Sequence, residues 1–277
     1  MRIPVLTPSK EEQTAIVKFL DHKTELIDRA IQIKEKQIEL LKERKQIIIH
    51  NAVTRGLNPK VKLKDSGVDW IGDIPEHWGV KRLSSIGKFS KGGGISRAEL
   101  TDEGVPAILY GDIYTKYEFS IKNVHHKTSI DVSKISKPIF KNTLLFTGSG
   151  ETMEDIGKCV VYLGDEVAYV GGDVIVFEQF DNDSLFLSYA LNTNNVNFEK
   201  AKYSKGEIIV HIYASKLKTI FVPVPPKSEQ QAISAYLLIA LSKINNAISL
   251  KLKEISNLEE YKTTLINSAT TGKIKVS

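Results

Sequence analysis

The feature that most constrains this chain is an internal repeat. The phrase TPSKEEQTAI near the N-terminus (Thr7–Ile16) returns near the C-terminus as PPKSEQQAI (Pro225–Ile233). With Gln13 aligned to Gln230, a shift of 217 residues (230 − 13) needs no gap over the next forty or so positions. Roughly four positions in ten are identical, which identifies a real internal repeat. The chain therefore carries two copies of one element, with something different between them.

Each copy predicts one long helix. No proline or glycine interrupts Lys10–Arg55 or Lys227–Thr271, and a glycine follows each copy, where a helix often ends. Ser9 followed by Glu12 is a capping-box pattern at the start of the first copy. About 45 residues at 1.5 Å per residue give a helix of roughly 65 Å.

Apolar residues in both copies are spaced alternately by three and four, as a coiled-coil seam requires. The predicted seam residues are Val17, Leu20, Ile27, Ile31, Ile38, Leu41, Ile48 and Ala52, and then Leu237, Leu241, Ile244, Ile248, Ile255, Leu258, Leu265 and Ala269. Lys34 matches Lys251 and Lys45 matches Lys262; these lysines either fix the register or are ordinary solvated side chains on a slightly different seam. We expect the two helices to pair antiparallel and to act as a spacer.

Between the helices, the pattern changes to short β-rich runs separated by glycines, which predicts a compact α+β domain with a curved mixed sheet. Leu185–Ala201 is the best helix candidate in this part, and the leader Lys62–Leu83, with both tryptophans, is expected to pack on the domain. The fold class is thus α+β: one globular mixed α/β domain flanked by two long helices that form an antiparallel coiled coil. The expected domain boundaries are 1–58, 59–224 and 225–277.

Composition narrows the class of protein. A net charge of +5 and a pI of about 9.0 fit a nucleic-acid partner without requiring one. The single cysteine, Cys159, excludes an internal disulfide framework and a multi-cysteine zinc site, and the run around it predicts a buried strand. There is no continuous apolar run of about 18 residues and no apolar signal core at the N-terminus, so we expect a cytoplasmic protein without a membrane partner.

Three short motifs were tested for chemistry. Phe146–Gly150 (FTGSG) has the shape of a methyltransferase cofactor loop, but the only Pro-Pro of the chain is not in a catalytic signature, so methyltransferase activity is not expected. His125–His126 has no companion ligand at helical spacing and predicts a surface turn rather than a metal site. The carboxylates in Gly150–Lys158 lack the usual nuclease order and predict a solvated turn at the edge of a DNA site.

Basic, polar and aromatic residues gather in four loops of the middle domain, which favours DNA binding. The candidate DNA-binding residues are Lys91, Gly93, Ser96, Arg97, Tyr110, Asp112, Thr115, Lys116, Tyr117, Ser149, Glu151, Thr152, Lys202, Ser204 and Lys205. Lysine, serine and backbone amides suit phosphates, whereas arginine and carboxylates suit base edges, and Arg97 is the favoured base reader. The alternative is a domain with ordinary surface charge.

The whole chain resembles the specificity (S) subunits of type I restriction–modification enzymes. The resemblance rests on the helix ends AVTRGL and SATTGK, the leader KLKDSGVDWIGDIPEHWGVKRL, the segments KGGGIS, YGDIYTKY, GSGETMEDIGK and KGEIIVHIYASKLK, and the helix start PPKSEQQAI. It implies a target-recognition domain that reads one half of a split site in double-stranded DNA. It also implies a scaffold for modification subunits, which bind S-adenosylmethionine themselves and methylate adenine, with a restriction subunit joining for cleavage. The resemblance implies no catalytic residue, metal or cofactor in this chain.

One departure from that family leaves alternatives open. A full S subunit alternates two recognition domains with two helices, whereas this chain has the order helix–domain–helix. A homodimer would supply the second domain and read a palindromic, interrupted target, and this is favoured over a monomer that waits for a different S chain. The other hypotheses are an assembly-only or regulatory chain and, least favoured, a free-standing nuclease.

Overall fold

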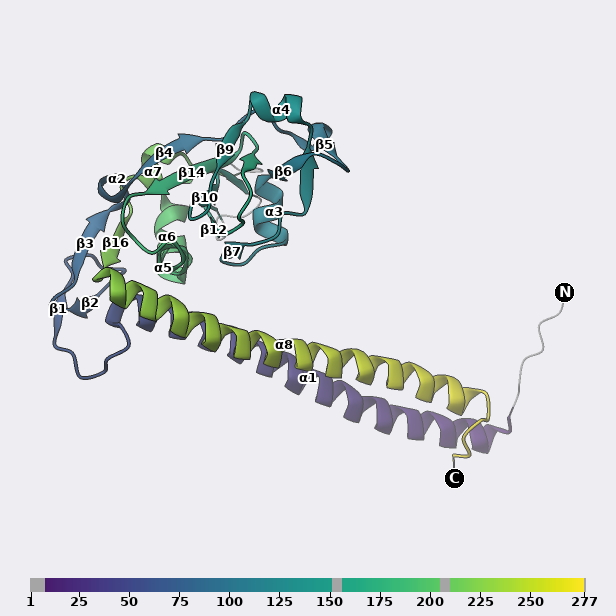
Figure 1. Cartoon of the computed structure of the whole chain (residues 1–277). Coiled ribbons are helices and arrows are strands. Elements are labelled where there is room, and N and C mark those ends of the chain that lie inside the picture. The colour runs from purple at the N-terminus through teal and green to yellow at the C-terminus, as the bar shows by residue number, and fades with distance from the viewer. Residues whose placement is uncertain (1–7, 151–155, 205–209, 277) are drawn as a thin grey trace. The chain divides into compact units, whose positions relative to one another are not determined.

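The two long helices are present with nearly the predicted bounds. The computed structural model describes residues 8–150, 156–204 and 210–276. Helix α1 spans Lys10–Arg55 and α8 spans Lys227–Thr270. They lie side by side and run in opposite directions (Figure 1), which confirms the predicted antiparallel pair.

The chain divides into two compact units. One contains Met1–Lys45 with Ile239–Ser277, and the other contains Gln46–Leu238. The last residues of α1 and the first residues of α8 therefore group with the globular part of the chain. The domain boundaries expected from the sequence follow the helix ends instead, and they stay a prediction.

The predicted seam is correct with one exception. Ile27, Ile38, Ala52, Leu237, Leu241, Ile244, Leu265 and Ala269 are buried, and Leu20, Ile31, Leu41, Ile48, Ile248, Ile255 and Leu258 are half-buried. The prediction for Val17 is wrong, because its side chain is 56% exposed. Ile16, four residues before Leu20, is half-buried instead, so the strict alternation of three and four that predicted Val17 does not extend to the first turns of α1.

Two seam lysines make ion pairs between the helices. The Lys34 ammonium lies 2.6 Å from the Glu254 carboxylate, and the Lys262 ammonium lies 2.6 Å from the Asp28 carboxylate, each across the two helices. A shift of either helix by one turn would separate both pairs. These contacts favour a role in the register over simple solvation, and that role stays a prediction.

The helix pair has an approximate internal two-fold symmetry. Lys45 donates to the Asn245 side chain over 2.7 Å, and Lys262 donates to Asp28 over 2.6 Å. The shift of 217 residues converts Lys45 into Lys262 and Asp28 into Asn245, so the two contacts are copies of one another. The sequence repeat is thus also a repeat of tertiary contacts.

The globular unit contains two five-stranded mixed sheets, where the sequence predicted one curved sheet. The first has the order β4 (Gly87–Lys91), β14 (Val174–Gln179), β10 (Leu144–Thr147), β12 (Cys159–Tyr162) and β7 (Ser120–Ile121). The second has the order β5 (Leu100–Thr101), β8 (His126–Thr128), β6 (Val105–Ile108), β13 (Ala168–Val170) and β9 (Lys137–Ile139). Pairing is antiparallel except for β12 with β7 and β13 with β6.

Shorter elements complete the unit. Three two-stranded sheets are formed by β1 (Leu63–Asp65) with β2 (Asp73–Pro75), β11 (Ser149–Gly150) with β15 (Val210–His211), and β16 (Phe221–Val224) with β3 (Gly79–Arg82). The short helices are α2 (Leu83–Ile86), η1 (Arg97–Glu99), α3 (Tyr110–Thr115), α4 (Ile130–Lys134), α5 (Ser184–Ala190), α6 (Asn194–Lys202) and α7 (Ala214–Leu217). The main core is shared by strands of both sheets and includes Ile108, Leu145, Val160, Val170 and Val176, all essentially inaccessible to solvent.

The single helix expected over Leu185–Ala201 is two helices, α5 and α6, with a break at Asn192. The Asn192 side chain accepts from the backbone N–H of Cys159 over 3.0 Å and donates to the Cys159 carbonyl over 2.6 Å. An asparagine that bonds to a neighbouring strand competes with the helix ladder, and the Thr193 hydroxyl then caps α6 by accepting from Val196 N–H. Cys159 is buried in β12 as predicted, and burial raises the pKa of its thiol.

One helix in the described residues, α8, is long and apolar enough to cross a membrane by length and composition alone. Its most apolar 18-residue window has a mean hydropathy of 1.3, and 28% of that window is buried. The expectation of no membrane span was based on uninterrupted apolar runs, whereas serine, lysine and asparagine residues interrupt the apolar stretch of α8. Because α8 also carries the ion-paired Lys262 of the seam, this single helix is weak evidence for a span.

Candidate nucleic-acid interface

A hollow of about 870 Å³ opens in the globular unit beside α3 and η1. Ten of its lining residues come from two stretches that the sequence singles out and from β8: Ile95, Ser96, Arg97, Tyr110, Gly111, Asp112, Tyr114, Thr115, Lys116 and His126. Leu109, Gly150 and the turn Gly171–Asp173 complete the lining. Chain segments that are far apart in sequence thus meet around one concave surface that combines polar and apolar area.

Six of the candidate DNA-binding residues line this hollow: Ser96, Arg97, Tyr110, Asp112, Thr115 and Lys116. Ser96 caps η1 by accepting from Ala98 N–H, while the Glu99 carboxylate accepts from Ser96 N–H over 2.8 Å. The Ser96 hydroxyl also donates to the Glu99 carboxylate, and this hydrogen bond, followed by the one from Ser96 N–H, holds the pKa of Glu99 below its usual value. The cap fixes the turn and leaves the next side chain, Arg97, exposed at the rim of the hollow.

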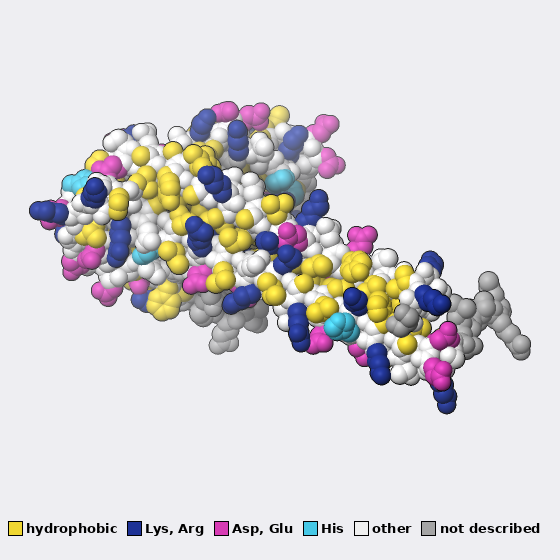
Figure 2. Space-filling model, turned by 90° about the horizontal axis from the view of Figure 1, so that it is seen from below, with side chains coloured by type: hydrophobic (Ala, Val, Ile, Leu, Met, Phe, Trp, Pro, Cys, Tyr) yellow, Lys and Arg dark blue, Asp and Glu magenta, His cyan; other side chains and the backbone are white. Residues whose placement is uncertain are grey.

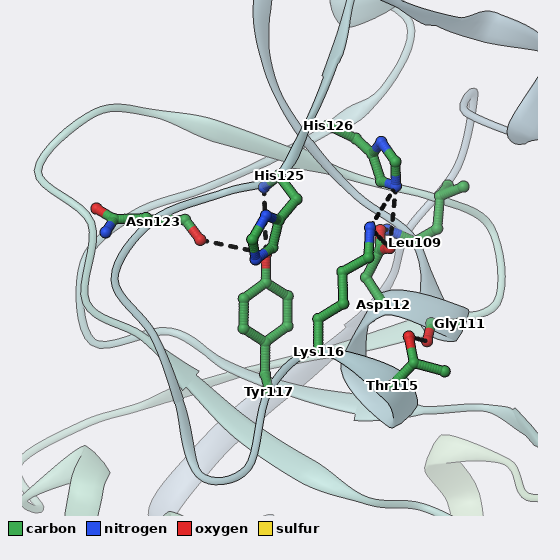
Figure 3. A network of polar contacts seen from close by, with 9 residues as sticks. All are labelled: Leu109, Gly111, Asp112, Thr115, Lys116, Tyr117, Asn123, His125 and His126. Atoms are coloured by element: carbon green, nitrogen blue, oxygen red, sulfur yellow. Dashed lines mark hydrogen bonds and ion pairs between the residues drawn. The ribbon is translucent and has the colours of Figure 1, made fainter. Parts of the chain in front are cut away.

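A three-residue cluster occupies one wall of the hollow (Figure 3). Asp112 is 7% exposed, and its Oδ1 lies 3.0 Å from the Lys116 ammonium and 3.2 Å from Nε2 of His126. The Lys116 ammonium lies 2.7 Å from the same imidazole nitrogen. The other oxygen, Oδ2, accepts from the backbone N–H of Leu109 over 3.2 Å. The buried carboxylate is therefore paired and hydrogen-bonded, as a buried charge requires.

The surface turn predicted for His125–His126 is wrong for its second residue. His126 belongs to β8, where it pairs with Ala107 of β6, and its ring points to Lys116 and Asp112. No residue type or spacing in the sequence indicates this, since His126 and Asp112 are 14 positions apart and meet only through the sheet. In residues 8–150, 156–204 and 210–276, no group of three His, Cys, Asp or Glu could hold a metal ion.

The fold and this surface can now be compared with known proteins. A family model described as the type I restriction modification DNA specificity domain matches residues 75–260. The chain belongs to this family.

Relatives and solved structures agree with the family. The chain is 26% identical to the type I restriction enzyme MjaVIII specificity subunit of Methanocaldococcus jannaschii over 100% of this chain and 63% of that protein. It is 28% identical to the putative type I restriction enzyme MjaX specificity subunit of the same organism, over 100% of this chain and 60% of that protein. The chain thus spans less than two thirds of the length of these curated relatives.

Two solved structures have the same fold. One, from work on complex assembly and conformational transition of the type I R-M system, has a TM-score of 0.70 at 15% identity, covering 96% of this chain and 60% of that chain. The HsdS subunit from Thermoanaerobacter tengcongensis has a TM-score of 0.55 at 16% identity, covering 98% of this chain and 60% of that chain.

Other candidate residues of this specificity domain do not line the hollow. Lys91 is exposed on β4, Gly93 donates its N–H to the Val170 carbonyl, and Tyr117 donates to the Asn123 carbonyl over 3.2 Å. Burial raises the pKa of Tyr117.

Ser149 is buried and hydrogen-bonded to His211 Nδ1 over 2.9 Å. Lys202 lies 4.9 Å from the centre of the Phe198 ring, and the Ser204 hydroxyl donates to the Ala201 carbonyl. Glu151, Thr152 and Lys205 lie outside the described residues. Of the four loops predicted to line one DNA-facing groove, the first two line this hollow, and Gly150 is the one described member of the third that joins them, so the groove itself stays a prediction.

The leader of the specificity domain is packed, as expected, and its anchor is a residue of the repeated phrase. Trp78 is 1% exposed, and its indole Nε1 donates to Oε2 of Glu229 over 3.0 Å. His77 Nε2 lies 2.7 Å from Oε1 of the same carboxylate. Next to it, Gln230 accepts from Asp183 N–H over 2.7 Å. The first turn of α8 is thus the support on which the leader and the α5 entry rest.

Proposed function

We propose that this chain is the DNA-reading, non-catalytic specificity subunit of a type I restriction–modification enzyme. Its globular unit reads one half of a split target in double-stranded DNA. The observation that carries the proposal is the hollow, because Arg97, Lys116 and Tyr110 come together there on the domain that the family model matches. Arginine and lysine donors in a concave loop surface suit both phosphates and base edges.

In this proposal the chemistry belongs to partner subunits. Modification subunits bind S-adenosylmethionine and methylate adenine, and a restriction subunit joins them for cleavage. The structure of the FTGSG motif supports this assignment of the chemistry to partner subunits. Phe146 and Thr147 of the motif are fully buried in β10, and Ser149 is hydrogen-bonded to His211.

The helix pair offers a surface on which modification subunits can dock. We define the α1 stripe as Leu26, Ile33 and Leu40, which recur every seven residues and are 47%, 60% and 53% exposed. The matched positions on α8 are Lys243, Leu250 and Asn257, so the stripe is largely a property of α1. Figure 2 has hydrophobic side chains in patches along the long helices. A heptad stripe outside the seam suits a further helix, which supports docking here.

A second copy of this chain would supply the other recognition domain. The approximate two-fold of the helix pair supports this, because it relates the α8 start to the α1 start, where Lys10, Glu12 and Gln13 match Lys227, Glu229 and Gln230. A two-fold dimer would read a target whose halves are inverted repeats.

The test of this function is DNA selection with the purified chain and its modification subunits. Enrichment of one split sequence from a random duplex pool supports it, and light scattering of the same complex gives the number of S chains. A complex that assembles with modification subunits but enriches no sequence would favour the second candidate function, a chain that serves assembly only. This candidate is kept because the chain matches 63% and 60% of the length of its curated relatives. Metal-dependent cutting by the chain alone would contradict both.

A further inference from the structure

The Asp112–Lys116–His126 cluster was not recognised as a unit in the sequence, and its geometry restricts what it can bind. Lys116 is the C-cap residue of α3, one helical turn after Asp112, and its backbone N–H closes that turn by donating to the Asp112 carbonyl over 2.9 Å. His126 reaches the same point from β8. Two secondary-structure elements therefore fix one ammonium group, whereas the candidate lysine Lys91 is exposed on β4.

The hydrogen-bonding capacity of the cluster decides its chemistry. An ammonium has three N–H donors and no acceptor. In Lys116 one donor faces Asp112 Oδ1, and a second faces Nε2 of His126 when that nitrogen is the acceptor, which leaves one for a ligand. One Asp112 oxygen faces the Lys116 ammonium, the other accepts from Leu109 N–H, and the residue is buried, so the carboxylate has little capacity left to accept from a ligand. The cluster therefore presents a positioned donor and selects a ligand with an acceptor atom.

The surroundings leave room for a duplex edge. A methyl group added at Gly111 or Gly172 would meet no atom within 4 Å, so the hollow is open on both of these sides. Lys116 and His126 are about one-third exposed, at 33% and 36% of their side-chain surface. The donor is thus held at a mouth and not sealed inside the domain.

We propose that Lys116 is a base-reading residue that specifies a guanine through one of its two major-groove acceptors, O6 or N7, with His126 and Asp112 as its positioning residues. This deepens the proposed function and rests on it. A phosphate oxygen offers the same acceptor chemistry, but a phosphate contact needs no fixed direction, whereas reading a base edge requires a donor held in place. The two-element support of Lys116 is the feature that favours the base.

The experiment is selection and competition binding with the full chain and its modification subunits, comparing Lys116→Ala with wild type. Lysine to a guanine edge is the commonest kind of specific contact, so the variant is expected to lose about 10- to 100-fold of discrimination at one guanine position and to keep its preference elsewhere. The matched control is Lys127→Ala, on the next residue of β8, which is exposed and points to the opposite face of the strand.

The positioning role has its own readout. His126→Gln keeps an acceptor for the Lys116 ammonium and should retain the guanine preference, whereas His126→Leu should lose it. Gly172→Leu fills the hollow without removing a polar group, and it should weaken binding to all duplexes while the melting temperature stays unchanged.

Four results would overturn the inference. The first is a wild-type target that contains no guanine, and the second is a Lys116→Ala variant that binds all sequences equally more weakly, as loss of a phosphate contact would cause. The third is a His126→Leu variant with an unchanged guanine preference, and the fourth is a Gly172→Leu variant with unchanged duplex affinity. If the wild-type complex itself selects no sequence, the proposed function fails instead, so the two failures are distinguishable.

Discussion

The starts of α1 and α8 have nearly the same sequence and the same local conformation, yet they do different things. Gln13 donates to the Pro8 carbonyl over 2.9 Å, and its copy Gln230 donates to the Pro225 carbonyl over 2.9 Å. The glutamates differ. Glu12 accepts from Ser9 N–H and caps its own helix, whereas Glu229 binds Trp78 and His77 of the leader.

One substitution accounts for this difference. The position of Ser9 in the first copy is taken by Pro226 in the second, and proline has no N–H to donate. The Glu229 carboxylate is therefore released from capping and can serve a tertiary contact. The comparison teaches that the shared local sequence determines where each helix begins. A single neighbouring residue then determines whether the glutamate of the first turn caps its own helix or contacts the globular unit.

The largest expected effect is at the supported start. Trp78→Ala removes a side chain that is 1% exposed and should destabilise the globular unit by about 3–5 kcal/mol, as burial-to-cavity changes of tryptophan do. Chemical denaturation followed by fluorescence of the remaining Trp70 measures this. A loss below about 1 kcal/mol would contradict the view that the leader is anchored there.

The two glutamates should respond unequally to the same change. Glu229→Ala leaves the Trp78 indole N–H without its acceptor and should cost about 1–3 kcal/mol. Glu12→Ala removes only a capping contact and should cost about 0.3–1 kcal/mol. Equal losses in denaturant titrations of the two variants would break the comparison.

The symmetric contacts of the helix pair provide a finer test. Asn245→Ala takes a partner from Lys45, which is 8% exposed, and should cost about 1–2 kcal/mol. Asp28→Ala takes the partner from Lys262, whose side chain is 31% exposed, and should cost about 0–1 kcal/mol. Thermal unfolding of both variants checks this order, and a larger loss for Asp28→Ala would contradict it.

The smallest effect is a pH dependence at the centre of the helix pair. Hydrogen bonds from Lys34 and then Lys251 hold the pKa of Glu254 below its usual value. A depressed carboxyl pKa contributes stability that is present above the unfolded-state value, near 4.5, and is lost as the pH falls through the folded-state value. The difference in melting temperature between wild type and Glu254→Gln should therefore shrink as the pH is lowered below about 5. A constant difference would exclude the linkage.

The features that could be predicted from the sequence are those that follow from apolar periodicity and helix-capping residues. Both long helices, fifteen of the sixteen seam positions named and the packed leader follow from heptad spacing, proline placement and the tryptophans. Asn192 could not be recognised as a helix break, because its partner Cys159 is 33 residues away. The role of His126 was missed for the same reason, since sheet pairing brings it to Asp112. Residue types in two loops thus predicted part of the lining of the hollow. The rest of the lining depends on long-range contacts that the sequence alone does not reveal.

The most direct test of the account is methylation-aware sequencing of DNA from a host that expresses this chain with its modification subunits. The account predicts adenine methylation at one split sequence whose two halves are inverted repeats, and a changed sequence when residues 59–224 are exchanged for those of another family member while the helices are kept. An asymmetric methylated target would contradict the homodimer. A target that follows the helices and not the exchanged domain would contradict the central claim that the globular unit reads DNA.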